Sequence, residues 1–170
     1  MKKSIIYFLF GSDIGDRKKH IDDACHLVEN EIGKILVESS FYVSEAWGFV
    51  SDSMFFNRVI AVETDLDVFA ILDITQKIEL MLGRSNKTAD KYQSRIIDID
   101  ILFYDDKIIE TQRLTIPHPQ IQNRRFALQP LAEIAPDFVH PSLHKSIAQL
   151  LDDCNDEKNV ELIDCEYCSF

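Results

Sequence analysis

The hydrophobic and polar residues of this chain follow two different periods, and segments with one period alternate with segments with the other. Short apolar runs or strict alternation predict strands, while apolar positions spaced three and four apart predict amphipathic helices. Boundary residues fit this interpretation, because Gly33 and Gly83 follow predicted helices and Asp65 or Asp67 can cap the second one. The predicted elements are a strand at 4–10, a helix at 16–32, strands at 34–44 and 55–64, a helix ending near 82, a strand at 97–103 and a short strand at 108–109.

The order β-α-β followed by a second β-α-β indicates an α+β fold. Such an order is typical of a ferredoxin-like antiparallel sheet with helices packed on it. Residues 126–151 are predicted to add one or two more helices, which gives a three-layer αβα arrangement. The 170 residues fit a single domain. Residues 152–170 contain seven acids and one lysine and are predicted to form a weakly ordered tail or a short strand.

The strand at 97–103 is unusual because Asp98 and Asp100 stand between isoleucines. The period of two sends both carboxylates to one face of the sheet, although aspartate is depleted in strands. At an effective dielectric of about 20, two like charges roughly 6 Å apart repel by about 3 kcal/mol. Two interpretations remain open: a solvated acidic face, or a site where Mg²⁺ joins these carboxylates to phosphate oxygens.

Charge and hydropathy exclude several classes of protein. The formal net charge of −11 argues against a nucleic-acid surface. Residues 84–125 contain eight Lys or Arg and six Asp or Glu, a balance of +2, so the remainder carries −13. A basic segment in an acidic chain indicates a small polyanion that binds locally.

No apolar run approaches the roughly 20 residues that span a bilayer, and the apolar start lacks a cleavage site. We therefore expect a soluble cytoplasmic protein without membrane contact.

The four cysteines lack the spacing of a disulfide framework. Cys165 and Cys168 form a CxxC pair in the acidic tail, and no second pair follows it. A zinc or redox site and a pair of reduced, incidental thiols both remain open there.

Two segments beside the aspartate strand carry groups that suit phosphate. Residues 83–95 contain four basic side chains, and arginine forks and mobile lysines both bind phosphate. The chain has no Walker motif and no kinase-type glycine loop, so a nucleotide site would be built differently. Two prolines flank His118 and restrict its backbone, with Arg113 and Arg124 nearby. A solvated loop and a structural histidine are the plainer alternatives.

A third segment suits a flat heteroaromatic ring. Phe55 and Asn57 fall on one strand face and offer an aromatic plate beside an amide that both donates and accepts. Trp47, the sole tryptophan, lies in the preceding loop. Core packing explains the phenylalanine equally well, whereas Asn57 does not fit that interpretation.

Taken together, these segments resemble the 6-hydroxymethyl-7,8-dihydropterin pyrophosphokinase family of folate synthesis. The most specific ones are Arg95-Ile96-Ile97-Asp98-Ile99-Asp100-Ile101-Leu102 and Leu114-Thr115-Ile116-Pro117-His118-Pro119. The other matching segments follow in order through nearly the whole chain: Phe10-Gly11-Ser12, Ser39-Ser40-Phe41-Tyr42, Trp47-Gly48-Phe49, Phe56-Asn57, Glu63-Thr64, Ile78-Glu79, Leu82-Gly83-Arg84 and Pro130-Leu131-Ala132-Glu133-Ile134-Ala135-Pro136.

This resemblance implies transfer of the β,γ-pyrophosphoryl group of ATP to the hydroxymethyl oxygen of a reduced pterin. It implies that Asp98 and Asp100 hold two Mg²⁺ ions and that Arg84 and Arg95 act on the phosphates. The residues that it assigns to ATP are Gln76, Glu79, Arg84, Lys87, Tyr92 (where the family usually has tryptophan), Arg95, Ile101, Arg113, Thr115 and His118. The residues that it assigns to the pterin are Ser44, Trp47, Phe55, Asn57, Asp98, Arg124 and Phe126.

Two functions remain open from the sequence. The first is a monomeric pyrophosphokinase whose basic loop closes over its substrates. The second is a non-catalytic ferredoxin-like module that binds a pterin or a nucleotide, because such scaffolds host many functions. The aspartate pair favours the enzyme, since a binding module has no need of it.

Overall fold

The computed structural model describes residues 2–47, 54–83 and 96–163. The elements in these residues are, in chain order, β1 (Ser4–Ser12), α1 (Arg17–Glu31), β2 (Lys34–Glu38), β3 (Tyr42–Ser44), β4 (Phe55–Thr64), α2 (Val68–Met81), β5 (Asp98–Tyr104), β6 (Ile109–Glu110), β7 (Thr115–Ile116), a 3₁₀ turn (Ile121–Asn123), α3 (Arg125–Ile134), α4 (Ile147–Asp153) and β8 (Val160–Leu162).

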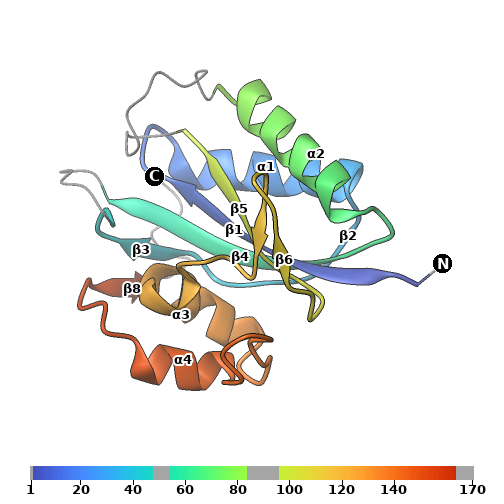
Figure 1. Ribbon diagram of the computed structural model, residues 1–170. Coiled ribbons are helices and arrows are strands. Elements are labelled where there is room, and N and C mark those ends of the chain that lie inside the picture. Colours follow the sequence, from blue (N-terminus) through green and yellow to red (C-terminus); the bar gives the residue numbers. More distant parts are fainter. Residues whose placement is uncertain (1, 48–53, 84–95, 164–170) are drawn as a thin grey trace.

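One antiparallel sheet of six strands forms the middle layer. Its order is β5-β1-β4-β3-β8, and β2 also pairs with β4. The strand β1 runs antiparallel to both of its neighbours, β4 and β5. Helices α1 and α2 lie on one side of this sheet, and α3 and α4 lie on the other (Figure 1). The predicted three-layer α+β arrangement is therefore confirmed.

Apolar cores fill the space on both sides of the sheet. On the first side, Phe8 and Ile71 belong to a cluster between the sheet, α1 and α2. On the second side, Phe103 and Leu128 belong to a cluster between the sheet, α3 and α4. Each large side chain that is fully buried stabilises the fold by roughly 1.5–3 kcal/mol. Burial on both faces explains why the strands carry long apolar runs.

Capping residues set the ends of the two long helices where the sequence predicted them. The side chain of Asp16 accepts a hydrogen bond from the backbone N–H of Lys19 at the start of α1. Asp67, and not Asp65, caps α2 by accepting from two backbone N–H groups of the first turn. Gly83 follows α2 with φ +102°, a conformation that side chains rarely adopt.

The prediction of a single strand at 34–44 is wrong, because this segment forms two strands, β2 and β3. Ser39 lies at the break, where its backbone N–H donates to the Val59 carbonyl at 2.8 Å. Its hydroxyl accepts from the Val59 N–H at 3.0 Å. A side-chain oxygen thus replaces a backbone carbonyl in the hydrogen-bond ladder with β4, and the regular strand is interrupted there.

Other boundaries differ by small shifts. The aspartate strand begins at Asp98, one residue later than predicted, and β6 begins at Ile109. Within residues 152–170, α4 continues to Asp153, and β8 pairs with β3. No helix among the described residues has the length and apolar character needed to cross a bilayer.

Candidate active site

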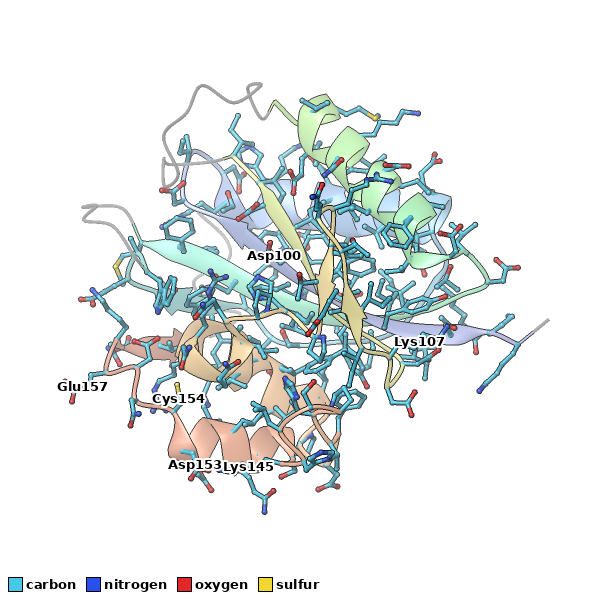
Figure 2. The ribbon with its side chains drawn as sticks, viewed as in Figure 1. Asp100, Lys107, Lys145, Asp153, Cys154 and Glu157 are labelled. Atoms are coloured by element: carbon cyan, nitrogen blue, oxygen red, sulfur yellow. The ribbon has the colours of Figure 1, made fainter. Side chains whose placement is uncertain are left out.

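Asp98 and Asp100 lie on one face of β5, as the alternation predicted. Both are half-buried, whereas Ile99 and Ile101 on the other face are 6% and 5% exposed and pack in the core beside α1 and α2. Figure 2 labels Asp100 on this strand. Mg²⁺ commonly binds one or two carboxylates and completes its shell with water and phosphate oxygens. This pair of oxygen donors fits that ion. No group of three or more His, Cys, Asp or Glu among the described residues could hold a metal alone.

A row of paired residues crosses four strands and joins the two predicted halves of the site. Asp98 pairs with Gly11, Gly11 with Asn57, and Asn57 with Tyr42. Directly paired residues of antiparallel strands share a face. Because strands lie about 4.8 Å apart, the backbones at Asp98 and Asn57 are separated by about 10 Å. Gly11 has no side chain, so this strip of the sheet stays open between them.

Glu79 brings a third carboxylate to the same end of β5. It projects from α2, is only 5% exposed, and its Oε1 accepts from the backbone N–H of Ile99 at 2.9 Å. Ile99 stands between the two aspartates, so this bond fixes the backbone that carries them. An intramolecular hydrogen bond contributes roughly 0.5–1.5 kcal/mol to stability, and a buried group left without its partner costs more.

His118, in the segment that follows β7, interacts electrostatically with Asp98. Its backbone N–H donates to the Leu102 carbonyl at 3.0 Å, and its Nδ1 accepts from the Gln120 N–H at 3.2 Å. Burial and, to a smaller extent, the charge of Arg124 lower the pKa of His118 to about 4, and Asp98 opposes the shift. The ring is therefore neutral near pH 7 and carries its proton on Nε2. It can donate a hydrogen bond, but it is a poor general base.

This lowered pKa predicts a specific loss of stability in acid. The unfolded chain binds a proton at His118 below about pH 6.5, while the folded protein resists it until about pH 4. The free energy of unfolding should therefore fall across that interval by roughly 2–3 kcal/mol on account of this group. Urea unfolding of His118→Asn should show a smaller loss between pH 7 and pH 4, because asparagine keeps an acceptor for Gln120 without titrating.

His26→Asn is the matched control, because His26 is exposed on α1. Its acid sensitivity should follow that of the parent protein. An equal acid loss in His118→Asn and in the parent would contradict the assignment of this effect to His118.

The residues predicted for a flat ring meet on the other side of Gly11. Asn57 is 2% exposed and Ser44 is 1% exposed. The Asn57 amide Nδ2 donates to Ser44 Oγ at 2.8 Å. Its Oδ1 lies 3.7 Å from the position that a Cβ on Gly11 would occupy. The amide oxygen thus borders the open strip, and Phe55, two residues earlier on the same strand face, lies beside it.

Arg124 connects the aromatic half of the site to the acidic half. Its guanidinium carbon lies 4.5 Å from the centre of the Trp47 ring and 5.7 Å from that of Phe126. Its Nη1 lies 4.0 Å from Asp100 Oδ2. Its Nε is buried and has no hydrogen-bond partner among the described residues. A charge in this position can attract a phosphate, and its plane can contact a flat ring.

Four further residues predicted for ATP lie on several elements of the structure. Ile101 is in the core on the far side of the sheet, and Gln76 is exposed on α2. Thr115 is exposed on β7, and Arg113 is paired with Asp73 of α2. The contact of these four residues with ATP stays a prediction.

Several predicted residues fall outside the described ones. These are Arg84, Lys87, Tyr92 and Arg95, together with Gly48, Phe49, Cys165 and Cys168. The free thiols in the described part, Cys25 and Cys154, are both buried.

The site also contains residues to which no sequence pattern assigned a role. Gly11 forms the open strip, and only its register between Asp98 and Asn57 shows this. The hydroxyl of Tyr42, the last residue of the same row, donates to Glu133 Oε2 at 2.7 Å. Both lie in segments that the resemblance had included, which was the one signal available for them.

Comparison with known proteins assigns a family to this arrangement. Residues 7–136 match the model of the 7,8-dihydro-6-hydroxymethylpterin-pyrophosphokinase family. A 2-amino-4-hydroxy-6-hydroxymethyldihydropteridine pyrophosphokinase of Porphyromonas gingivalis is 39% identical over 140 residues, which are 81% of this chain and 95% of the relative. The corresponding protein of Aquifex aeolicus is 38% identical over 146 residues, covering 85% of this chain and 88% of the relative.

Solved structures show the same fold in longer proteins. A crystal structure described as HPPK-DHPS in complex with substrates superposes with a TM-score of 0.71 at 18% identity. The match covers 89% of this chain and 43% of that one. Plasmodium falciparum HPPK-DHPS with pteroate gives a TM-score of 0.71 at 20% identity, over 89% of this chain and 42% of the other. The chain thus spans less than half of these proteins, and the likeness concerns the fold.

Proposed function

The chain belongs to the 7,8-dihydro-6-hydroxymethylpterin-pyrophosphokinase family, and on this basis we propose that ATP is its co-substrate and Mg²⁺ its metal. As a pyrophosphokinase of folate biosynthesis, it places a diphosphate on the hydroxymethyl group of the reduced pterin. With ATP as donor, the bond from the β-phosphorus to the oxygen of the α-phosphate breaks, the pterin hydroxyl oxygen bonds to the β-phosphorus and releases its proton, and AMP leaves.

The observation that carries this proposal is the row from Asp98 to Asn57. Its two ends suit the two reactants: hard carboxylate oxygens at one, a buried amide with aromatic rings at the other. The separation of about 10 Å brings a ring at Asn57 within reach of phosphates at Asp98. Catalysis of phosphoryl transfer depends mainly on such positioning and on charge neutralisation.

We assign the metal to Asp98 and Asp100, and we propose two ions. When bound, Mg²⁺ would neutralise charge on the phosphate oxygens and lower the pKa of the pterin hydroxyl. Glu79 would hold the backbone between the two aspartates. Neutral His118 would donate from Nε2, and Arg124 would stand between the phosphate and the ring.

Further assignments come from the family resemblance. Arg84 and Arg95 would stabilise charge on the transferred group, and Lys87 and Tyr92 would contact ATP. We also propose a monomeric enzyme, because one chain supplies both the acidic pair and the ring-binding residues.

Removing the metal is the direct test of this proposal. Purified protein with ATP, Mg²⁺ and 6-hydroxymethyl-7,8-dihydropterin should produce AMP, and excess EDTA should reduce the rate at least about 1000-fold. Added Mg²⁺ should restore it. AMP formation can be followed by chromatography, with the pterin omitted as a control. Pterin binding without any AMP would instead support the non-catalytic binding module.

A further inference from the structure

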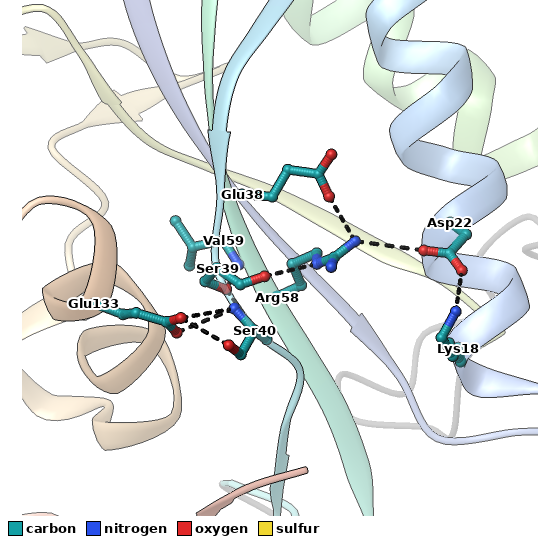
Figure 3. Close-up of polar contacts among 8 residues, drawn as sticks. All are labelled: Lys18, Asp22, Glu38, Ser39, Ser40, Arg58, Val59 and Glu133. Atoms are coloured by element: carbon teal, nitrogen blue, oxygen red, sulfur yellow. Dashed lines mark hydrogen bonds and ion pairs between the residues drawn. The ribbon is translucent and has the colours of Figure 1, made fainter. Parts of the chain in front are cut away.

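Glu133, near the end of α3, is bonded to the segment that begins β3. Both of its carboxylate oxygens accept from the Ser40 backbone N–H at 3.1 Å, and Oε1 also accepts from Ser40 Oγ at 2.7 Å (Figure 3). Oε2 accepts from the Tyr42 hydroxyl at 2.7 Å. Hydrogen bonds to an ionised acceptor are roughly twice as strong as neutral ones. This set, which we call the Glu133 clamp, ties α3 to residues 40–42.

The Glu133 clamp meets the row of paired residues that crosses the site. Tyr42 is 7% exposed and pairs directly with Asn57. Burial raises the pKa of Tyr42 above its ordinary value, and the hydrogen bond to Glu133 adds to this, so the hydroxyl remains a donor. Ser44, which accepts from the Asn57 amide, lies two residues further on the same face of β3. The clamp therefore acts on the strand that supports Asn57.

The other end of α3 contacts the same part of the chain. Arg124, at the start of α3, stacks on Trp47, which follows β3. Phe126 lies in the first turn of α3, between this contact and Glu133. The helix is thus attached to the strand region at both ends. These two attachments fix the distance between Phe126 and Ser44, where the flat ring is proposed to bind.

The break before β3 is also held from the opposite face, and this offers a control. Arg58 Nε donates to the Ser39 carbonyl at 2.9 Å. Its Nη1 is 2.7 Å from Glu38 and 3.4 Å from Asp22 of α1 (Figure 3). This network stabilises the same break without touching α3. Losing it should affect stability but not the distance between α3 and β3.

We propose that Glu133 is a positioning residue for the pterin, which holds α3 against β3 so that Arg124 and Phe126 face Ser44 and Asn57. This role rests on the proposed function, because it assumes that the pterin binds between α3 and β3. Glu133 itself would not contact substrate. Its effect would be on pterin affinity rather than on the chemical step.

Three substitutions remove different numbers of hydrogen bonds from the Glu133 clamp. Glu133→Ala removes all of its bonds and should raise the KM for the pterin about tenfold, with kcat and the KM for ATP changed less than about twofold. Tyr42→Phe removes one bond at constant shape, so we expect about a threefold rise. Glu133→Gln should stay within about twofold of the parent, because its amide can accept from Ser40 and donate to the Tyr42 oxygen.

A second readout needs no substrate. Trp47 is the sole tryptophan, so its emission reports the cover that Arg124 gives it. Glu133→Ala should shift this emission to longer wavelength, since a loosened α3 exposes the indole to water. Glu133→Gln should match the parent. If Glu133→Ala does not fold, Tyr42→Phe provides both readouts with a smaller effect.

Glu38→Ala is the matched control for general destabilisation. It should lower stability in urea while leaving the pterin KM and the Trp47 emission at parent values. Equal rises in pterin KM for Glu133→Ala and Glu38→Ala would overturn the positioning role, as would unchanged KM and emission in Glu133→Ala. If the parent itself formed no AMP, the proposed function would fail, and the emission comparison would still decide whether Glu133 places α3.

Discussion

Replacing Asp98 or Asp100 with alanine is expected to abolish AMP formation while the protein stays folded. Both carboxylates are half-buried at the surface of β5, and the neighbouring Ile99 and Ile101, which are buried in the core, point to the other face. The folded core should therefore survive. The proposed metal would lose half of its protein ligands, and a metal ion is worth several kcal/mol of transition-state stabilisation. We expect kcat/KM to fall at least about 1000-fold in either variant.

The matched control for this pair is Asp106→Ala. Asp106 is exposed in the turn that follows the same strand, so its replacement removes the same charge from the same region. AMP formation by this variant should equal that of the parent. Circular dichroism and urea unfolding of all three variants would verify their folding. Parent-like AMP formation in Asp98→Ala or Asp100→Ala would refute the proposed metal site.

Replacing Asn57 with leucine is expected to have the second largest effect, on the pterin side. The amide is almost completely buried, donates to Ser44 and presents its oxygen toward the open strip at Gly11. Leucine has a similar volume but neither donates nor accepts, so the polar edge of the ring would be left unpaired. The KM for the pterin should rise about 100-fold, while the KM for ATP should change less than about threefold.

Asn57→Asp gives a second test if the leucine variant folds poorly. Aspartate keeps the shape, and the Ser44 hydroxyl can donate to it, yet the amide donor is lost and a buried charge is added. We expect weaker pterin binding in this variant as well. Thr64→Val serves as the control, because it removes a buried hydrogen bond to the Ile32 carbonyl at the far end of the same strand. A pterin KM that rises as much in Thr64→Val as in Asn57→Leu would mean that stability, not recognition, is measured.

The two predicted effects separate the two halves of the site. The aspartate variants should lack turnover even when both substrates are saturating. The Asn57 variants should recover turnover at high pterin concentration. Glu133→Ala should resemble the Asn57 variants at a smaller scale, because it acts on the same half through the position of α3.

The sequence determined the parts of this protein that depend on local pattern. The period of two placed Asp98 and Asp100 on one face of β5, and the bounds of β4 were predicted at Phe55 and Thr64. Aspartate at a helix start and glycine after a helix end act through neighbouring backbone groups, so they can be read without the fold. The family resemblance likewise rests on short segments in order, and the comparisons confirm it.

Only the tertiary structure decided which distant residues meet. The strand predicted at 34–44 is broken because Ser39 bonds to Val59 in a neighbouring strand, a contact that no local period encodes. The register between strands placed Gly11 between Asp98 and Asn57, and side-chain packing brought Arg124 to Trp47 and Glu133 to Tyr42. Such contacts join residues many positions apart, and their geometry is fixed when the two cores pack on opposite faces of the sheet.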